Sequence, residues 1–275
     1  SAPNLVYVAN SGYRGNDQFT FRVMDGQGAE SKATVSISVE ESPVGCTVYE
    51  GFDYKLGPLK GQSSKSKVGL KGSWMMESDK KFIISEKSLS LRSLPSTGGK
   101  LAPSPHARDK GATCLLDNVA IERDGILENG KELWFSIVVG YDQMNVTNTR
   151  FNFGFKETKA SSETFLGLEL KYGRFHLKLG EELADSRVFT RMTKRTFPAN
   201  EPALLVGHCR WGATDEDLDT IELYKVFDLH EEKPALLTKP TSTLRRTIDQ
   251  AKFDSLFIYI NTNLMMDEIR VGPSY

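Results

Sequence analysis

Residues 253–272 read FDSLFIYINTNLMMDEIRVG, and this stretch decides the fold that the sequence predicts. Apolar side chains at Leu256, Ile258 and Ile260 alternate with other residues, a period of two that is typical of a strand with a buried face. After a turn-like segment at 261–263, residues 265–272 predict a closing strand. Such a strand needs a partner from far upstream, because an unpaired edge strand promotes aggregation. The predicted partner is VYEGFDY at residues 48–54.

The composition narrows the class of protein. The 275 residues are 39% hydrophobic and 26% charged, as in an ordinary soluble globular protein. The net charge of −1 argues against a general nucleic-acid binder, which would be strongly basic. No apolar run approaches the length of a membrane span. Because the chain starts at Ser1 without an initiator Met or a signal-peptide pattern, we expect a processed product or a piece of a longer chain.

The three cysteines, Cys46, Cys114 and Cys209, are widely spaced and form neither a disulfide framework nor a metal-binding pattern. We expect buried free thiols that pack as small hydrophobic residues. If the protein is exported, a Cys46–Cys114 or Cys114–Cys209 bridge is the alternative.

Residues 1–41 differ in composition from the rest and predict a β-hairpin. QFTFRVM at 18–24 and KATVSISV at 32–39 alternate, and DGQG at 25–28 forms the turn. Gly15, Asp17, Phe19 and the Asp-Gly-x-Gly turn resemble the C-terminal half of the cadherin-like, Ig-type repeats of large bacterial surface proteins. The resemblance implies an Ig-like unit whose early strands lie upstream or come from a neighbouring domain or subunit, since a half-sandwich leaves an apolar face uncovered.

After a short linker, residues 46–275 show short alternating segments separated by turns, and no long amphipathic helix. Strands are predicted at 81–85, 88–92, 133–139, 150–155, 165–170, 174–179, 203–210, 220–226 and 256–260. So many short strands predict an all-β fold, a two-sheet β-sandwich or jelly roll.

Several segments of this second unit carry a resemblance of their own. YEGFDY at 49–54, GPLKGQ at 57–62 and GSW at 72–74, then PALLVG at 202–207 and DEIRVG at 267–272, are similar to laminin-G-like, concanavalin A-like jelly rolls. Those domains occur in large exported proteins of planctomycetes and related bacteria. The resemblance implies a jelly-roll domain at 46–275 displayed outside a bacterial cell. It does not define a ligand.

In jelly rolls of this kind a structural cation often joins the first strand to the last. Glu50 or Asp53 and Asp267 or Glu268 would supply the oxygen ligands that Ca²⁺ requires. The alternative is that these carboxylates face solvent or cap turns. The acidic loop at 215–219 begins like an EF-hand, but Thr220 replaces the required Gly, so an EF-hand is rejected. A solvated acidic turn is the favoured interpretation of this loop, and a loop-type Ca²⁺ site is the alternative.

Sugar binding uses aromatic faces and a few orienting polar groups. The large aromatics to consider are Trp74, Trp134, Trp211, Tyr141 and Tyr172. Trp134 lies mid-strand and is expected in the core. Trp211, at the end of a strand, is either a core-edge residue or an exposed platform, and Tyr141, just past a strand end, is the best loop aromatic.

Residues 186–197, SRVFTRMTKRTF, predict a basic binding strand. Arg187, Arg191 and Arg195 fall on one face of a strand, interleaved with Phe189 and Phe197. Guanidinium groups among aromatics suit a sulfated or uronic polysaccharide, because Arg forms bidentate contacts with oxyanions. The alternative is a solvated basic face balanced by nearby acids.

No enzymatic pattern is convincing. Asp267 and Glu268 are adjacent and are therefore expected on opposite faces of a strand, whereas a glycosidase needs facing carboxylates. The four histidines have no metal-binding spacing, and no nucleophile elbow is present. We therefore expect a non-catalytic carbohydrate-binding or adhesive module, with a glycan and neighbouring domains as partners. The alternatives are a structural spacer of a surface layer and, last, a polysaccharide-degrading enzyme.

Overall fold

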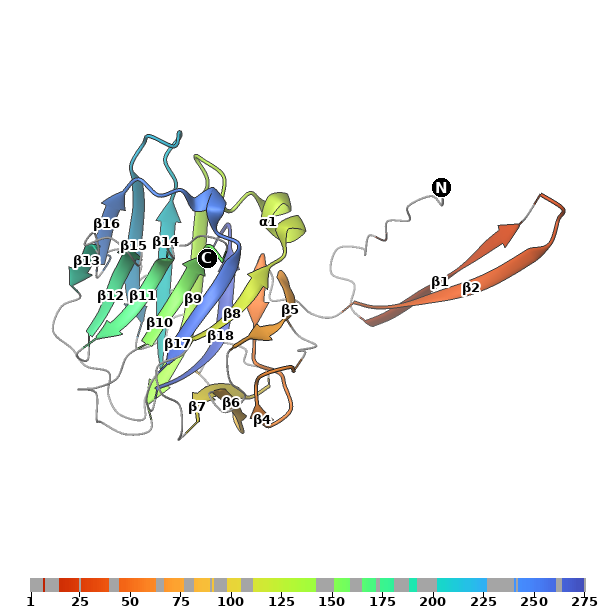
Figure 1. Ribbon diagram of the computed structural model, residues 1–275, viewed down its shortest axis with the longest axis horizontal. Helices are drawn as coiled ribbons and strands as arrows, with labels where there is room; N and C mark the ends of the chain where they lie inside the picture. Colours follow the sequence, from red (N-terminus) through yellow and green to blue (C-terminus); the bar gives the residue numbers. More distant parts are fainter. Residues whose placement is uncertain are drawn as a thin grey trace. The chain divides into compact units, whose positions relative to one another are not determined.

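The computed structural model describes residues 7, 15–24, 26–39, 45–62, 67–76, 82–89, 91, 98–104, 111–141, 151–158, 165–171, 174–180, 188–191, 202–226, 240, 242–260 and 264–274. For some strand residues, Tyr141, His176 and Arg191 among them, it describes the backbone pairing but not the side chain. The chain divides into two compact units, Ser1–Val44 and Gly45–Tyr275 (Figure 1).

The smaller unit is an antiparallel hairpin of β1 (Gly15–Met24) and β2 (Glu30–Val39), as the sequence predicts. Pairing of Phe19 with Val35 and of Phe21 with Ala33 gathers apolar side chains on one face, while Thr20 and Thr34 share the other. Val23 on the apolar face is 58% exposed. A two-stranded ribbon with no core is only marginally stable by itself.

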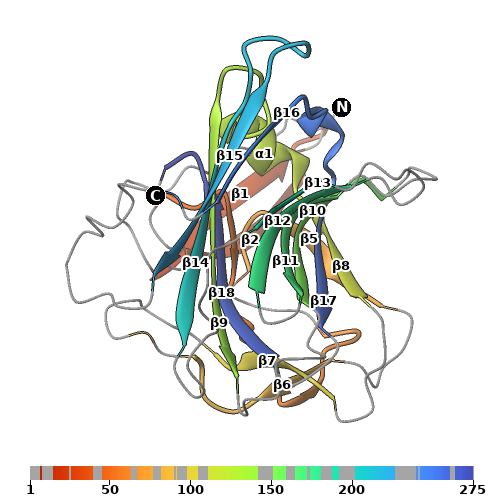
Figure 2. The ribbon, with the colours of Figure 1, turned by 90° about the vertical axis from the view of Figure 1, so that its left-hand side faces the viewer.

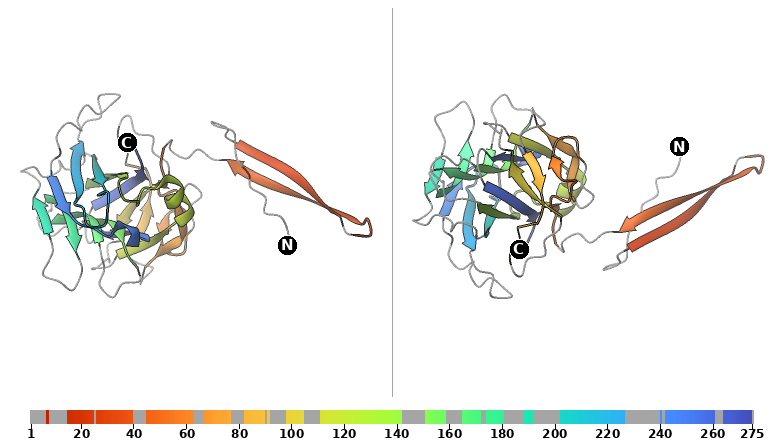
Figure 3. Two further views of the ribbon diagram at one scale, coloured as in Figure 1. Left: turned by 90° about the horizontal axis from the view of Figure 1, so that it is seen from above. Right: turned by 90° about the horizontal axis from the view of Figure 1, so that it is seen from below.

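The larger unit is a sandwich of two antiparallel sheets (Figure 2). The seven-stranded sheet has the order β13 (Val188–Arg191), β12 (Arg174–Gly180), β11 (Phe165–Lys171), β10 (Phe151–Lys156), β17 (Ser255–Ile260), β8 (Gly111–Leu116) and β5 (Leu70–Met75). The nine-stranded sheet has the order β16 (Ser242–Arg246), β15 (Asp219–Val226), β14 (Ala203–Arg210), β9 (Glu132–Tyr141), β18 (Leu264–Gly272), β7 (Lys100–Pro103), β6 (Phe82–Ser85) and β4 (Gly57–Pro58), with β3 (Val48–Glu50) beside β18. Figure 3 shows this unit from above and below.

The core lies between the two sheets and is filled by alternate residues of their strands. From the seven-stranded sheet, Phe151, Phe153 and Phe155 of β10 point inward; from the nine-stranded sheet, Leu133 and Phe135 of β9 meet them. Each fully buried side chain of this size stabilises the fold by about 1.5–3 kcal/mol. The residues between these positions lie on the opposite side of each sheet, which we call its outer face.

The predicted pairing of the first and last strands is confirmed. β3 pairs with β18, Ile269 opposite Glu50, and the Thr47 amide donates to the Val271 carbonyl at 2.7 Å. The chain therefore enters the larger unit beside the strand with which it leaves. A Cβ at Gly45 would already be in van der Waals contact with Ser274.

Local structure departs from regular strands at two places. The expectation that Asp267 and Glu268 lie on opposite faces of a strand assumes regular alternation, but a β-bulge between Asp267 and Arg270, with Glu268 at φ 53°, interrupts it, and both carboxylates are buried. Residues 88–92 were expected to form a strand, but Ser88, Leu89 and Leu91 have irregular backbone. Leu89 and Leu91 instead pack onto an apolar patch of the nine-stranded outer face.

Helices are minor. The helix α1 (Asn118–Asp124) starts at Asp117, whose carboxylate accepts from the Val119 amide, and ends at Gly125 in the left-handed conformation. In the described part of the chain, a 3₁₀ turn, η2 (Gln250–Lys252), precedes β17. Among the described residues no helix is long and apolar enough to cross a membrane.

Candidate functional site

The carboxylates predicted to bind calcium have separate protein partners. Glu50 is fully buried and accepts hydrogen bonds from the Tyr54 hydroxyl at 2.6 Å, the Phe52 amide at 2.8 Å and Trp74 Nε1 at 3.0 Å. Burial raises the pKa of Glu50 above its ordinary value despite these donors. Asp53 is exposed.

Asp267 and Glu268 use other donors. Asp267 accepts from the Leu89 amide at 2.8 Å and from the Ser88 hydroxyl, and burial raises its pKa to about 7. Glu268 accepts from Tyr49 at 3.0 Å and pairs with Arg270 at 2.7 Å. No group of three or more potential metal ligands occurs among the described residues. Calcium binding stays a prediction that this geometry does not favour.

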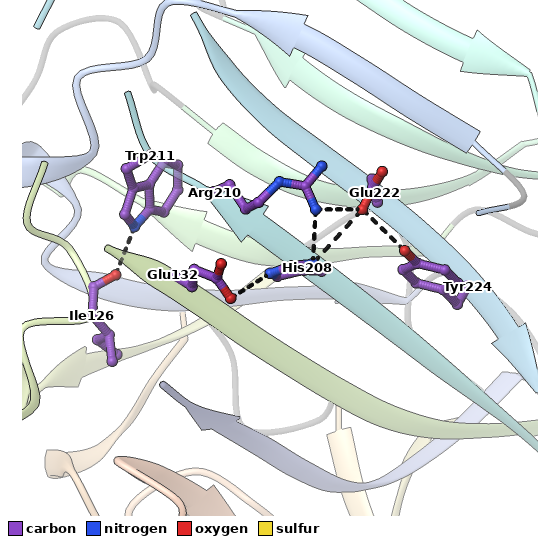
Figure 4. Close-up of polar contacts among 7 residues, drawn as sticks. All are labelled: Ile126, Glu132, His208, Arg210, Trp211, Glu222 and Tyr224. Carbon is purple, nitrogen blue, oxygen red and sulfur yellow. Dashed lines mark hydrogen bonds and ion pairs between the residues drawn. The ribbon is translucent and has the colours of Figure 1, made fainter. Parts of the chain in front are cut away.

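Trp211 is not an exposed platform. Its side chain is buried in the main core, and the indole N–H donates to the Ile126 carbonyl at 2.7 Å (Figure 4). Asp219 of the acidic loop is also buried, and its two oxygens accept from the amides of Gly212 and Ile248, both at 2.7 Å. Both residues fix the loop between β14 and β15.

The nine-stranded outer face carries a polar cluster, which we call the His208 cluster: Glu132, His208, Arg210, Glu222 and Tyr224 (Figure 4). His208 Nε2 lies 3.0 Å from Glu132, and Glu222 accepts from Arg210 and from Tyr224, each at 3.0 Å. Burial alone would raise the pKa of Glu222, but the donors Arg210 and Tyr224 outweigh it, and the pKa lies below its ordinary value. Glu222 is therefore ionised at neutral pH and unsuited to act as a general acid.

The seven-stranded outer face is different in charge. Backbone pairing sets Tyr259, Asn152, Glu169, His176 and Arg191 in one row across five adjacent strands. Directly paired residues of antiparallel strands share a face, and this row alternates with core residues. Four strand spacings make the row about 19 Å long.

Basic residues dominate this face on β10 to β13. Of the outer positions there, five are basic and Glu169 alone is acidic; the basic positions are Lys156, Lys171, Arg174, Lys178 and Arg191. The whole chain carries a net charge of −1. By register, the outer positions of these four strands thus carry a local excess of basic over acidic residues.

A pair of buried glycines lies at the centre of the basic face. Gly154 and Gly167 are paired, and a Cβ on either would overlap the backbone of the neighbouring strand. Phe257, paired with Gly154, lies under the Lys156 ammonium, 5.2 Å from the ring centroid, and Tyr259 is half-buried. The amide oxygen of Asn152 is buried with no hydrogen-bond partner among the described residues.

Of the residues predicted to bind a ligand, Arg191 lies at the end of this row. Arg187 and Arg195 lie outside the described residues, and Tyr141 ends β9, paired with Leu264, its side chain likewise outside the description. Lys171, Arg174 and Lys178 are not among the residues predicted to bind a ligand. Alternation within the predicted strand at 174–179 sets Arg174 and Lys178 opposite core positions such as Leu177, whereas Lys171 lies one residue beyond the predicted strand at 165–170.

Comparison with known proteins adds one family. Residues 1–38 match the family model described as Bacterial Ig domain, which includes most of the β1–β2 hairpin. No curated protein matches the sequence.

Solved structures similar to the chain have low identity. They include an endo-β-1,4-glucuronan lyase from the fungus Trichoderma reesei (TM-score 0.41, 10% identity, 80% of this chain and 94% of that one). Others are the metal-free carbohydrate recognition domain of Emp46p (0.44, 8%, 66% and 86%) and the botulinum neurotoxin serotype G binding domain (0.41, 10%, 83% and 47%). The chain thus spans about half of the neurotoxin domain. The sandwich fold follows from the strand order of this chain and not from these similarities.

Proposed function

We propose that the larger unit is a non-catalytic module that binds an anionic polysaccharide across the outer face of the seven-stranded sheet. The observation that carries this proposal is the excess of five basic positions over one acidic position on β10 to β13. Like charges brought together on one face repel one another, so a partner that neutralises them gains free energy on binding. Carboxylate and sulfate groups pair well with Arg, and Lys contributes point charges.

The half-buried aromatics Phe257 and Tyr259 on this face support a sugar chain as the carrier of that negative charge, because sugar rings pack against aromatic side chains. A ligand rich in hydroxyl groups also supplies a donor for the Asn152 amide, once the amide rotates toward it.

The same face supports binding without catalysis. Hydrolysis of a glycosidic bond generally requires two carboxyl groups within about 5–10 Å of each other. On β10 to β13 Glu169 is the one acidic outer position, and it has no acidic cross-strand partner in the described register.

We further propose that the module belongs to an exported bacterial surface protein. The match of residues 1–38 to the bacterial Ig domain supports this location. The exposed apolar face of the hairpin favours a second role, as a spacer that packs against other domains.

A triple variant that removes three positive charges from this face tests the proposal. Lys156→Gln, Lys178→Gln and Arg191→Gln together should weaken binding to alginate, a polyuronate, or to heparin, a sulfated polymer, by roughly five- to a hundredfold, since exposed ion pairs contribute up to about 1 kcal/mol each. The dependence of affinity on salt should also become shallower, because fewer counterions are released. Biolayer interferometry at several salt concentrations measures both.

The matched control removes the same charges elsewhere: Lys55→Gln, Arg123→Gln and Lys131→Gln, all exposed and outside the seven-stranded sheet. It should retain the affinity of the unmodified protein. The proposal fails if both triple variants lose affinity equally, or if neutral dextran binds as tightly as alginate and heparin.

A further inference from the structure

A second row of side chains, on the other sheet, has the composition of an anion site. Backbone pairing places Arg210 opposite Thr220, and Thr220 opposite Arg245, on β14, β15 and β16. All three alternate with core residues such as Cys209, Ile221 and Leu244, so they share the nine-stranded outer face. Two arginines therefore flank one hydroxyl, about 10 Å apart at the backbone.

The contacts of these side chains leave donors for a ligand. Arg210 uses one terminal nitrogen for Glu222 and His208, and Figure 4 shows its other terminal nitrogen directed away from both. Arg245 is exposed and forms no ion pair with any described carboxylate. The Thr220 hydroxyl likewise has no hydrogen-bond partner in the described part of the chain.

The nearby acids are bonded to other partners. Glu132, which the register sets opposite Arg210 on β9, lies 3.0 Å from His208 Nε2. Asp215 accepts from Asn129 at 2.6 Å, and Asp217 accepts from the Thr214 hydroxyl at 2.9 Å within its own turn. Glu222 is already paired with Arg210, which holds that guanidinium in place over the strand. The row thus contains Arg210, which is held by its ion pair with Glu222, the exposed Arg245, and the Thr220 hydroxyl between them.

We infer that Arg210, Thr220 and Arg245 bind a tetrahedral oxyanion, as a sulfate ester or a phosphate monoester. Such a group has several oxygens, enough to accept from two guanidinium groups and one hydroxyl at the same time. The site lies on the opposite sheet from the proposed polysaccharide face and does not depend on it.

Isothermal titration with glucose 6-sulfate, glucose 6-phosphate and neutral glucose tests the inference. At least one of the two anionic sugars should bind saturably, and which one binds identifies the ester. Arg245→Gln should weaken that binding roughly tenfold, the loss of one charge-assisted hydrogen bond. Thr220→Val should weaken it less.

Arg246→Gln is the matched control, because Arg246 is the next residue of the same strand, equally exposed, and pairs with Asp219 on the alternate side. It should leave the affinity unchanged, as should Lys156→Gln on the other sheet. Equal losses in Arg245→Gln and Arg246→Gln would overturn the inference, and so would the absence of saturable binding by both anionic sugars.

Discussion

Asp267 couples the stability of the fold to pH. In the folded protein burial raises its pKa from 3.8 to about 7, and the neighbouring Glu268 charge adds to the shift. Between about pH 4 and pH 7 the folded chain therefore binds a proton that the unfolded chain does not. Stability should be greatest below this range and fall as pH rises toward 7, by at most about 1.4 kcal/mol per pH unit.

Asp267→Asn should remove this dependence. The amide oxygen of Asn can still accept from the Leu89 amide, and position 267 then carries no buried charge at any pH. We expect a flatter profile of stability between pH 4 and pH 7, and a variant at least as stable as the parent at pH 8. Urea denaturation at several pH values measures this; parallel profiles for the two proteins would contradict the assignment to Asp267.

The hydrogen-bond partners of three buried acidic residues could not be predicted from the sequence. Glu50, Asp267 and Glu268 were considered as metal ligands because carboxylates near paired strands suggest a hard cation. Their hydrogen-bond donors, Trp74, Tyr49 and Leu89, come from segments far away in the sequence. A bulge that buries two adjacent carboxylates leaves no periodic signal, so the alternation could not reveal it.

At the level of single elements, strands rich in alternating apolar residues were predictable. The predicted strand at 203–210 has the observed bounds of β14, and the one at 256–260 is one residue shorter than β17. The strands that the sequence does not predict include β7 (KLAP) and β8 (GATCLL). In both, Gly, Pro or Ala weakens the alternation of apolar residues. Their place in the sheets is set by pairing with β18 and β17, which is long-range information.

Gly167 of β11 should tolerate no side chain. A Cβ there would overlap the Phe153 carbonyl and the Gly154 backbone, which cannot move without disturbing β10. Gly167→Ala should lower the free energy of unfolding by about 1–3 kcal/mol, as overpacking does. Thermal unfolding followed by circular dichroism measures the change.

The control for this substitution is Gly140→Ala in β9. There the added methyl group would meet the end of the Leu89 side chain at 3.2 Å, which can rotate away. We expect a smaller loss of stability than for Gly167→Ala. The reverse order would show that the β10–β11 pair is more adaptable than its backbone spacing indicates.

For the molecule as a whole, the division into two units predicts independent behaviour. A chain of residues 45–275 retains both sheets and the entire main core. Its melting temperature should lie within about 2 °C of that of the full chain, and its affinity for alginate should be unchanged. Calorimetry and binding assays on the two chains check this; a much lower melting temperature would show that the hairpin unit contributes to the sandwich.

The charge distribution could be predicted from the sequence only in part. Arg191 is predicted as a ligand-binding residue, and Arg174 and Lys178 of β12 lie in the predicted strand at 174–179 with the correct phase, whereas Lys171 of β11 lies just beyond the predicted strand at 165–170. The order of strands that places Lys156, Lys178 and Arg191 on a single face depends on pairing between segments far apart in the chain. The net charge of the whole chain is close to zero, and it therefore does not reveal the local excess of positive charge on this face.

The meeting of Gly45 with Ser274 has an architectural consequence. A domain whose two ends lie close together can be inserted into a surface loop of another protein without moving the ends of that loop apart. In a chain of several such domains, each copy would project sideways from the connecting segments instead of adding its own length to them. The outer faces of its sheets would then stay accessible to solvent.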